Sequence, residues 1–177
     1  MKKNLLSIAL AASFGLFALA PAAHAADGQI DFAGSVVASS CIINGGTSNF
    51  TVTLPPVSTK SLSALGKTAG RVPVPIALTN CTAGSKVRAY FESGVTTKSM
   101  GRLAVDPGGA SNVDLQLLNE SFGPLIAGAA VGAQNTGIVT VPASGNVDLT
   151  YHAEYFATGA ATAGAVKSRV MYSISYE

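Results

Sequence analysis

The sequence predicts an all-β chain folded as a sandwich of two sheets. From Ala26 onward, apolar residues recur at every second position in short runs, which is the period of a strand with one covered face. Clusters of Gly, Pro, Asn and Ser separate these runs, and no stretch keeps a helical period. Eight such runs in about 150 residues suit a two-sheet sandwich.

Prolines mark two of the first four runs. Pro55 and Pro56 end the second run, because proline cannot continue a strand ladder. Pro73 and Pro75 alternate with apolar residues in the third run, so their missing N–H groups face the same side and predict an edge or a bend. The apolar positions are Ile30, Phe32 and Val36; Phe50, Val52 and Leu54; Val72, Val74, Ile76 and Leu78; and Val87, Ala89 and Phe91.

The last four runs are separated by turn-rich loops. Segments 106–111 and 127–137 are predicted to be loops, and the glycines within 157–165 favour a small-residue connection over a helix. The apolar positions are Val113, Leu115 and Leu117; Ile138, Val139 and Val141; Val147, Leu149, Tyr151, Ala153 and Tyr155; and Val170, Tyr172, Ile174 and Tyr176.

The first 25 residues have the organisation of a secretion signal. Lys2 and Lys3 precede an apolar run over 5–19, and Ala23-His24-Ala25 is a small-x-small cleavage site. The run is shorter than the roughly 20 residues that a membrane-spanning helix needs. We therefore expect residues 1–25 to be a cleaved signal peptide. Its removal from 177 residues leaves 152, with nine basic and nine acidic side chains.

The composition excludes some classes of function. Charged residues make up 11% of the chain, against about 25% in an average soluble domain. Eleven Lys and Arg against nine Asp and Glu leave no basic excess to neutralise phosphates, so no nucleic-acid partner is expected.

The two cysteines favour one disulfide. Cys41 and Cys81 are the only cysteines, and a secreted chain with an isolated pair most often joins them. A zinc site is not expected, because the two cysteines and His152, the only histidine after residue 25, do not supply four Cys or His ligands.

No group of residues predicts catalysis, so the chain is not expected to be an enzyme. His152 and Asp148 share one strand face but stand about 13 Å apart at the rise of a strand, too far to form a hydrogen bond. We expect His152 to be a solvated strand histidine. The carboxylates form no close pair, and no glycine-rich phosphate loop follows a strand, so neither a metal nor a cofactor is expected.

Both ends of the mature chain resemble strands with one apolar side. Gly28, Ile30 and Phe32 share a face near the start, and the run from Val170 to Tyr176 continues almost to the last residue, Glu177. These ends could simply be the first and last strands of a closed sandwich. Periodicity alone does not show whether they have that role or another.

Four segments together resemble the structural subunits of chaperone-usher fimbriae, the type 1 pilin family. They are GQIDFAGSVVASSC at 28–41, VPVPIALTNC at 72–81, YFATGAATAGA at 155–165 and YSISYE at 172–177. The resemblance extends from Gly28 to Glu177 and includes both cysteines. It implies an incomplete immunoglobulin-like sandwich that is completed by a donor strand from a neighbouring subunit.

The resemblance also implies a division of the chain and the roles of its residues. Segment 26–37 would be the N-terminal donor-strand extension, and 38–177 the pilin domain. The donor strand would use Gly28, Ile30 and Phe32, and the Cys41–Cys81 disulfide would tie the first strand to the second. The C-terminal strand, with Tyr172, Ile174, Tyr176 and Glu177, would bind the periplasmic chaperone.

The expected function is that of a structural subunit of an adhesive surface fibre. The expected partners are identical or related pilin subunits, a periplasmic chaperone and an outer-membrane usher, and the expected route leads through the periplasm to the cell surface. Two alternatives remain open: a minor adaptor or anchor subunit, and a secreted, self-complete β-sandwich that binds carbohydrate.

Overall fold

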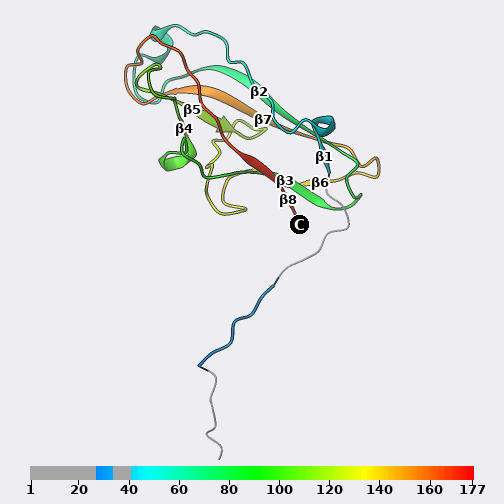
Figure 1. Cartoon of the computed structure of the whole chain (residues 1–177). Coiled ribbons are helices and arrows are strands. Elements are labelled where there is room, and N and C mark those ends of the chain that lie inside the picture. Colours follow the sequence, from blue (N-terminus) through cyan, green and yellow to red (C-terminus); the bar gives the residue numbers. More distant parts are fainter. Residues whose placement is uncertain (1–26, 34–40) are drawn as a thin grey trace, which may run out of the picture. The chain divides into compact units, whose positions relative to one another are not determined.

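The computed structural model describes residues 27–33 and 41–177 (Figure 1). The chain divides into two compact units, Met1–Val36 and Val37–Glu177, and each is described by itself. The predicted signal peptide and Val36 lie outside the described residues. No helix among residues 27–33 and 41–177 is long and apolar enough to cross a membrane.

The second unit consists of two antiparallel sheets. The larger sheet has the order β1-β2-β7-β5-β4 and the smaller has the order β6-β3-β8 (Figure 1). The larger contains β1 (Ile42–Ile43), β2 (Thr68–Thr79), β7 (Val147–Ala157), β5 (Val113–Leu118) and β4 (Leu103–Ala104). The smaller contains β6 (Val139–Thr140), β3 (Lys86–Phe91) and β8 (Tyr172–Tyr176). Three short 3-10 helices, η1 (Asn44–Gly46), η2 (Thr59–Leu62) and η3 (Ser99–Gly101), lie in the connections.

The core lies between the facing sides of the two sheets. Alternate residues of the long strands are buried, as in β7, where Leu149, Tyr151 and Ala153 are all less than 6% exposed. Phe91 of β3 meets Tyr151 edge to face, with ring centroids 5.2 Å apart. The predicted two-sheet sandwich is therefore confirmed, and the period-2 pattern identified its inward faces.

The run at Phe50, Val52 and Leu54 is not a strand of either sheet, which corrects the prediction. Its side chains alternate between covered and open positions, but segment 47–58 has no strand assignment. Alternation indicates that one face of a segment is covered. It does not show whether the backbone forms hydrogen bonds with another strand. The sequence also missed β1 and β4, which are two residues long and too short to show alternation.

The two prolines of β2 lie on its outer edge, as predicted. Pro73 and Pro75 are opposite His152 and Thr150 of β7, and β1 covers β2 only from Leu78 onward. Residue 77 has the same orientation as the prolines, and its N–H donates to Asn44 Oδ1 over 2.8 Å. This edge of β2 therefore offers no free N–H at three successive outward positions.

The Cys41–Cys81 disulfide joins the start of the described domain to the end of β2. Both cysteines are 8% exposed and belong to the core. The two cysteines are 40 residues apart in the sequence. Closing a loop of this length with a disulfide stabilises a fold by roughly 4 kcal/mol in the chain-entropy model. The expected pairing is confirmed.

Candidate functional site

The outer edge of β8 has no strand partner among the described residues. β8 pairs with β3 from Phe91↔Tyr172 to Val87↔Tyr176 and is the last strand of its sheet. An edge strand presents a row of N–H and C=O groups that can bind a further strand. The sequence alone could not reveal this, because an edge strand and a central strand show the same alternation.

Segment 48–57 lies beside β8 and is a second unpaired stretch of backbone. It makes no backbone–backbone hydrogen bond within the described chain. Val52, Leu54 and Val57 are half-buried, whereas Thr51 and Thr53 are exposed. The segment is held by its apolar side chains and by hydrogen bonds from tyrosine hydroxyls to the carbonyls of Ser48 and Pro55.

Two tyrosines of β8 reach the opposite backbone. Tyr172 Oη donates to the carbonyl of Ser48 over 2.7 Å, and its ring lies 6.1 Å from that of Phe50. At the other end, the N–H of Cys41 donates to Tyr176 Oη over 2.9 Å. These contacts place β8 opposite Cys41 at one end and Ser48 and Phe50 at the other. We call the site formed by β8, its approach 166–171 and the opposite segments 41–43 and 48–57 the slot.

The slot is lined by apolar side chains that are only partly covered. They pack against the core without being enclosed by it. A hollow of about 200 Å³ adjoins segment 56–59 and the loop 161–166. The half-buried apolar residues of the two walls are Ile43, Val52, Leu54, Val57, Val166, Val170, Tyr172, Ile174 and Tyr176.

Burial raises the pKa of two hydroxyls near the slot. Desolvation raises the pKa of Tyr172 and that of Tyr155 above the ordinary tyrosine value. Tyr155 Oη donates to the carbonyl of Pro55 over 3.2 Å, so it ties β7 to the end of segment 48–57. Both hydroxyls stay protonated at neutral pH and act as donors.

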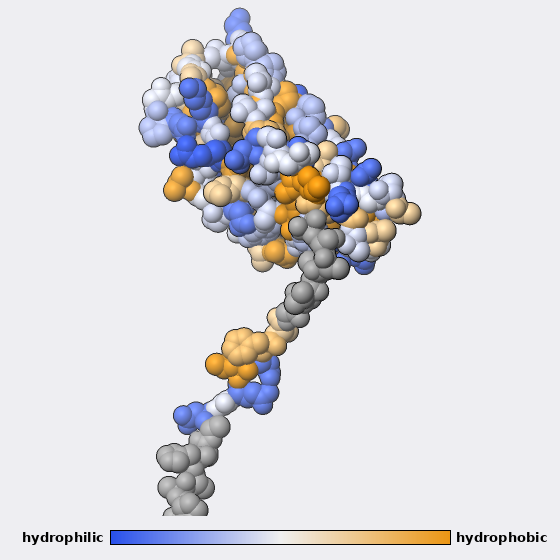
Figure 2. Space-filling model, turned by 45° about the vertical axis from the view of Figure 1, so that its right-hand side comes forward, coloured by the Kyte–Doolittle hydropathy of each residue, from blue (hydrophilic) through white to orange (hydrophobic). Residues whose placement is uncertain are grey.

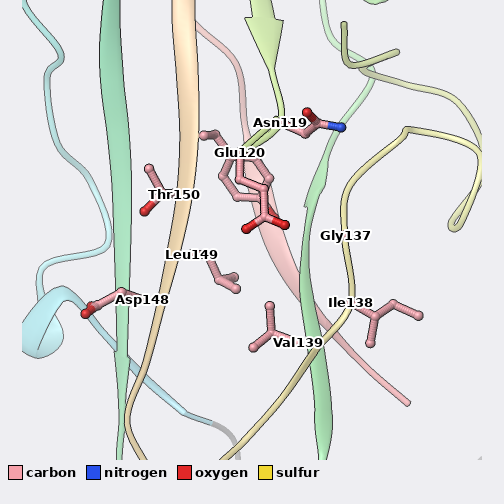
Figure 3. A pocket seen from close by; sticks show the side chains of 9 residues that line it. Asn119, Glu120, Gly137, Ile138, Val139, Asp148, Leu149 and Thr150 are labelled. Carbon is pink, nitrogen blue, oxygen red and sulfur yellow. The ribbon is translucent and has the colours of Figure 1, made fainter. Parts of the chain in front are cut away.

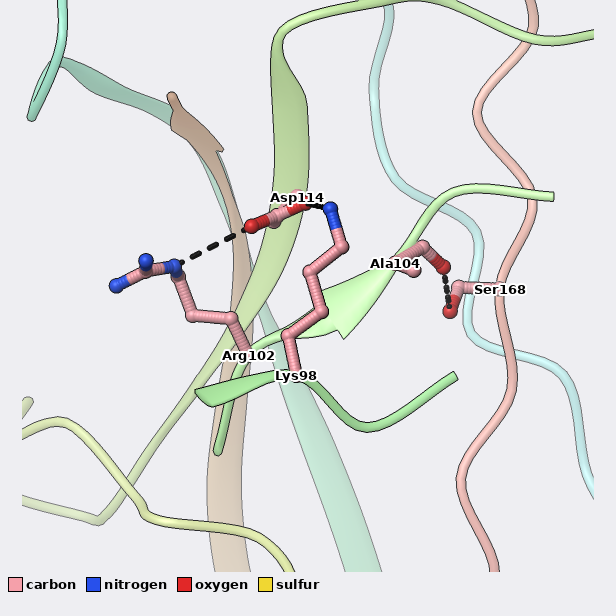
Figure 4. Close-up of polar contacts among 5 residues, drawn as sticks. All are labelled: Lys98, Arg102, Ala104, Asp114 and Ser168. Atoms are coloured by element: carbon pink, nitrogen blue, oxygen red, sulfur yellow. Dashed lines mark hydrogen bonds and ion pairs between the residues drawn. The ribbon is translucent and has the colours of Figure 1, made fainter. Parts of the chain in front are cut away.

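The approach to β8 is anchored by contacts with the loop around β4. Ser168 Oγ donates to the carbonyl of Ala104 over 2.6 Å, and the N–H of Asp106 donates to the carbonyl of Lys167 over 2.8 Å (Figure 4). Figure 4 also shows Asp114 of β5 between Lys98 and Arg102, at 2.6 and 3.3 Å. Asp114 is 1% exposed, so these cations compensate a buried charge and fix the loop that holds β8.

The C-terminal end of β8 is held by β3. The N–H of Glu177 donates to the carbonyl of Lys86 over 2.9 Å, and the N–H of Lys86 donates back over 3.2 Å. The Glu177 side chain forms an ion pair with Arg88. The four predicted residues Tyr172, Ile174, Tyr176 and Glu177 are thus brought together along one strand.

The predicted donor residues lie in the other unit and are exposed. Ile30 is 78% exposed and Phe32 is 92% exposed. Figure 2 shows apolar atoms open to view within segment 27–33. A Cβ atom built on Gly28 would meet nothing within 4 Å. Other apolar side chains of the described chain are exposed to a similar extent, among them Val95 at 90% and Met171 at 75%.

A second hollow is too small for an organic ligand. It measures about 40 Å³, and small-molecule sites usually measure about 300–1,000 Å³. It lies between β7 and the residues around Glu120 and Val139. In Figure 3 the carboxylate of Glu120 points into this hollow and that of Asp148 points away, so the two acids do not converge.

His152 differs from the prediction of a solvated strand histidine. Its ring packs against Phe122 at 4.7 Å, and its Nδ1 is buried without a hydrogen-bond partner in the described chain. The guanidinium carbon of Arg71 also lies over the Phe122 ring, 4.5 Å from its centroid. Phe122 lies in the turn after β5, in a different segment from His152. Strand periodicity therefore could not predict that Phe122 covers His152.

Sequence reasoning also missed Asn44 and Arg88. Asn44 closes the edge of β2, and Arg88 forms an ion pair with Glu177, the residue after β8. A charged residue at an outward strand position is an ordinary pattern, so only the three-dimensional neighbours distinguish Arg88 from a solvated arginine.

The fold and the slot define an all-β sandwich subunit in which β8 is an edge strand without a further strand partner among the described residues. Residues 54–177 match the model of a protein family described as "Type-1 fimbrial protein, A". The chain is 46% identical over 169 residues to the major fimbrial subunit SMF-1 of Stenotrophomonas maltophilia, which covers 91% of this chain and 99% of that protein. The chain belongs to the type-1 fimbrial protein family.

Solved structures agree with this assignment. A Burkholderia pseudomallei antigen and type I fimbria protein is similar at 28% identity with a TM-score of 0.54, covering 78% of this chain and 90% of that one. A subunit of a chaperone-usher pilus has the same fold, with a TM-score of 0.62 at 18% identity, covering 89% and 100%. The chain is therefore a structural protein and not an enzyme.

Proposed function

We propose that this structural pilus subunit polymerises by donating its N-terminal extension, residues 26–37, to the slot of another subunit. The observation that carries the proposal is the slot itself, where the open edge of β8 lies beside segment 48–57, which makes no backbone–backbone hydrogen bond within the described chain. A strand placed there could form hydrogen bonds along both sides. Donor-strand complementation of this kind is an established form of strand addition.

The donor would be the stretch from Gly28 to Phe32. Ile30 and Phe32 share one face of an extended chain, and both are exposed. Each apolar side chain contributes about 1.5–3 kcal/mol when it is fully buried, and each ladder hydrogen bond adds about 0.5–1.5 kcal/mol. Gly28 would lie where the donor approaches the floor of the slot most closely, because only a residue without Cβ fits there.

The acceptor would be the slot, with Tyr172, Ile174 and Tyr176 on one wall. Before assembly, a periplasmic chaperone would lend its own strand to the same edge, next to Tyr172, Ile174, Tyr176 and Glu177. An outer-membrane usher would then exchange the chaperone for the next subunit. Cleavage of residues 1–25 would deliver the chain to this route, and the finished fibre is a component of the cell surface.

A gel of cell-surface material tests the proposal. A donor-strand fibre should run as a ladder of multimers in detergent until it is boiled, because dissociation requires extracting a whole strand. Ile30→Asp combined with Phe32→Asp should abolish the ladder and leave capture of the subunit by the chaperone unchanged.

Gln29→Asp is the matched control. Residue 29 alternates with residues 28 and 30, so its side chain would face away from the slot. This variant should give the wild-type ladder. A normal ladder from the double variant would show that Ile30 and Phe32 do not form the polymer contact.

A further inference from the structure

The approach to β8 carries two cations that the fold leaves unpaired. Lys167 and Arg169 are exposed and alternate with half-buried residues of the slot wall. Neither cation forms an ion pair within the described chain. Their backbone carbonyls accept hydrogen bonds from the N–H of Asp106 and the hydroxyl of Thr96, so this stretch is fixed without the use of its charged side chains.

The two cations lie at one end of the slot, beside the larger hollow. Val166 lines this hollow of about 200 Å³ together with Val57 and Thr59 from the opposite side. The residue after Thr59 is Lys60, which is exposed and has no ion-pair partner in the part of the chain that the structure describes. We call this end of the slot, formed by segments 56–60 and 161–169, the mouth. Three cations against the carboxylate of the half-buried Asp106 leave the mouth positively charged.

The segment that we propose as the donor carries the complementary charge. Asp27 and Asp31 are exposed, and neither forms an ion pair among residues 27–33 and 41–177. Successive side chains of an extended chain point to opposite sides, so both carboxylates would face outward when Ile30 and Phe32 enter the slot. The donor therefore presents its acids on the same outward side on which the slot wall presents its cations.

The direction of the donor decides which carboxylate reaches the mouth. Every strand pair of the two sheets is antiparallel in the described chain, and we expect the donor to run antiparallel to β8 as well. β8 runs from the mouth toward Tyr176, which contacts Cys41. The Gly28 end of the donor would then lie near Tyr176, and the Phe32 end would lie near the mouth.

The register that brings Phe32 to the mouth places Asp31 close to Arg169. In this register Asp31 lies opposite Met171, and Arg169 is its diagonal neighbour on the same face. Diagonal neighbours are about 7–8 Å apart, within reach of a long side chain. Glu92 pairs with Met171 from the far side, two strand spacings or about 10 Å from the donor, so it opposes this attraction only weakly.

We propose that Asp31 of one subunit pairs with Arg169 of the subunit that accepts its donor strand, and that the positive mouth steers the donor into the slot. The partner of the mouth is thus an acidic and apolar segment of a second copy of this chain. Charges at the rim of an interface act mainly on the rate of association. At about 0.1 M salt the attraction extends about 10 Å. This inference rests on the proposed donor-strand exchange.

The test follows the association of a fluorescent peptide of residues 27–37 with the full mature chain. The acceptor chain carries Ile30→Asp and Phe32→Asp, so that it cannot donate its own segment. Asp31→Asn in the peptide, or Arg169→Met in the acceptor, should lower the association rate about fivefold at low salt. At 1 M salt, where the screening length is about 3 Å, each variant should associate within about twofold of the wild-type rate.

Two matched controls remove the same charges elsewhere. Asp27→Asn removes a carboxylate from the other end of the donor, and Lys86→Met removes an exposed cation near the other end of β8. Both should associate at the wild-type rate at low salt. A larger loss with Asp27→Asn than with Asp31→Asn would overturn the pairing, because it would place the opposite end of the donor at the mouth.

A charge exchange tests the pair directly. The peptide with Asp31→Arg should associate slowly with the wild-type acceptor, and the acceptor with Arg169→Asp should associate slowly with the wild-type peptide. Combining the two variants restores the attraction and should recover most of the wild-type rate. A combination as slow as either single variant would show that these two residues do not meet.

The same assay separates this inference from the proposed function. Failure of the wild-type peptide to bind, or normal binding of a peptide with Ile30→Asp and Phe32→Asp, would contradict donor-strand exchange and the pairing with it. Binding of the wild-type peptide at a rate that depends neither on Asp31 nor on salt would contradict only the steering by the mouth.

Discussion

Tyr151 shows how single side chains connect the two sheets. It belongs to β7, yet its hydroxyl accepts a hydrogen bond from the N–H of Ala89 in β3 over 3.2 Å. Tyr172 and Tyr176 make similar long-range contacts from β8 to the chain near the disulfide. Tyrosine suits these positions because its ring fills the core while its hydroxyl satisfies a polar group at a distance.

Burial gives Tyr151 a predictable pH dependence. Desolvation raises the pKa of Tyr151 above the ordinary tyrosine value of about 10, and the hydrogen bond from Ala89 opposes part of this shift. The folded state therefore binds its proton more tightly than the unfolded chain. The stability that this contributes is complete below about pH 10 and is lost as the pH rises toward the folded-state pKa.

The measurement is the free energy of urea unfolding between pH 8 and pH 11, compared with that of Tyr151→Phe. The variant should be less stable at pH 8, because it leaves the N–H of Ala89 without an acceptor. Above about pH 10 its stability should fall less steeply than that of wild type. Parallel curves would show that Tyr151 does not contribute to alkaline unfolding.

At the scale of elements, strands buried on one face were predictable and their partners were not. β2, β3, β5, β7 and β8 were all found, because each alternates over at least five residues. The run at Phe50 alternates equally well but has no sheet partner. Whether a run pairs with another strand depends on residues far away in the chain. For the same reason, the sequence did not predict the hydrogen bond between Tyr172 and Ser48.

The sequence predicted the site residues that lie along β8, but it did not predict the residues that lie opposite this strand. Tyr172, Ile174 and Tyr176 follow from alternation and from the family resemblance. Segment 48–57 as the opposite wall, and Arg88 as the partner of Glu177, required the tertiary arrangement. The roles of Gly28, Ile30 and Phe32 as donor residues stay a prediction.

The apolar face of β8 should be essential for accepting a strand. Ile174 lies opposite Ala89 of the core and is half-buried, so Ile174→Asp would place a charge in the β8 wall of the slot. We expect this variant to lose capture by the chaperone in a pull-down assay. Met171→Asp is the control, because Met171 is 75% exposed just before β8, and it should be captured normally.

At the scale of the whole molecule, the subunit should be completed by its own donor sequence. Residues 27–37 joined after Glu177 by a flexible linker should enter the slot and yield a monomer that unfolds cooperatively. Burial of Ile30 and Phe32 in the appended copy should raise the free energy of unfolding by about 3–6 kcal/mol over that of the unlinked chain.

The control fusion carries Ile30→Asp and Phe32→Asp in the appended copy and should gain little stability. Urea unfolding measures both fusions on the same scale. An unlinked chain as stable as the intact fusion would mean that the sandwich is already complete and that the slot does not need a strand.

The closed edge of β2 affects how filaments could grow. Pro73, Pro75 and the Asn44 cap remove the outward N–H donors from one side of the larger sheet, while β8 keeps its own. In the proposed polymer, β8 would receive the donor segment of the next subunit, so subunits would join head to tail. The outward edge of β2 offers no free N–H at Pro73, Pro75 or residue 77, so this edge would not join one filament to another side by side.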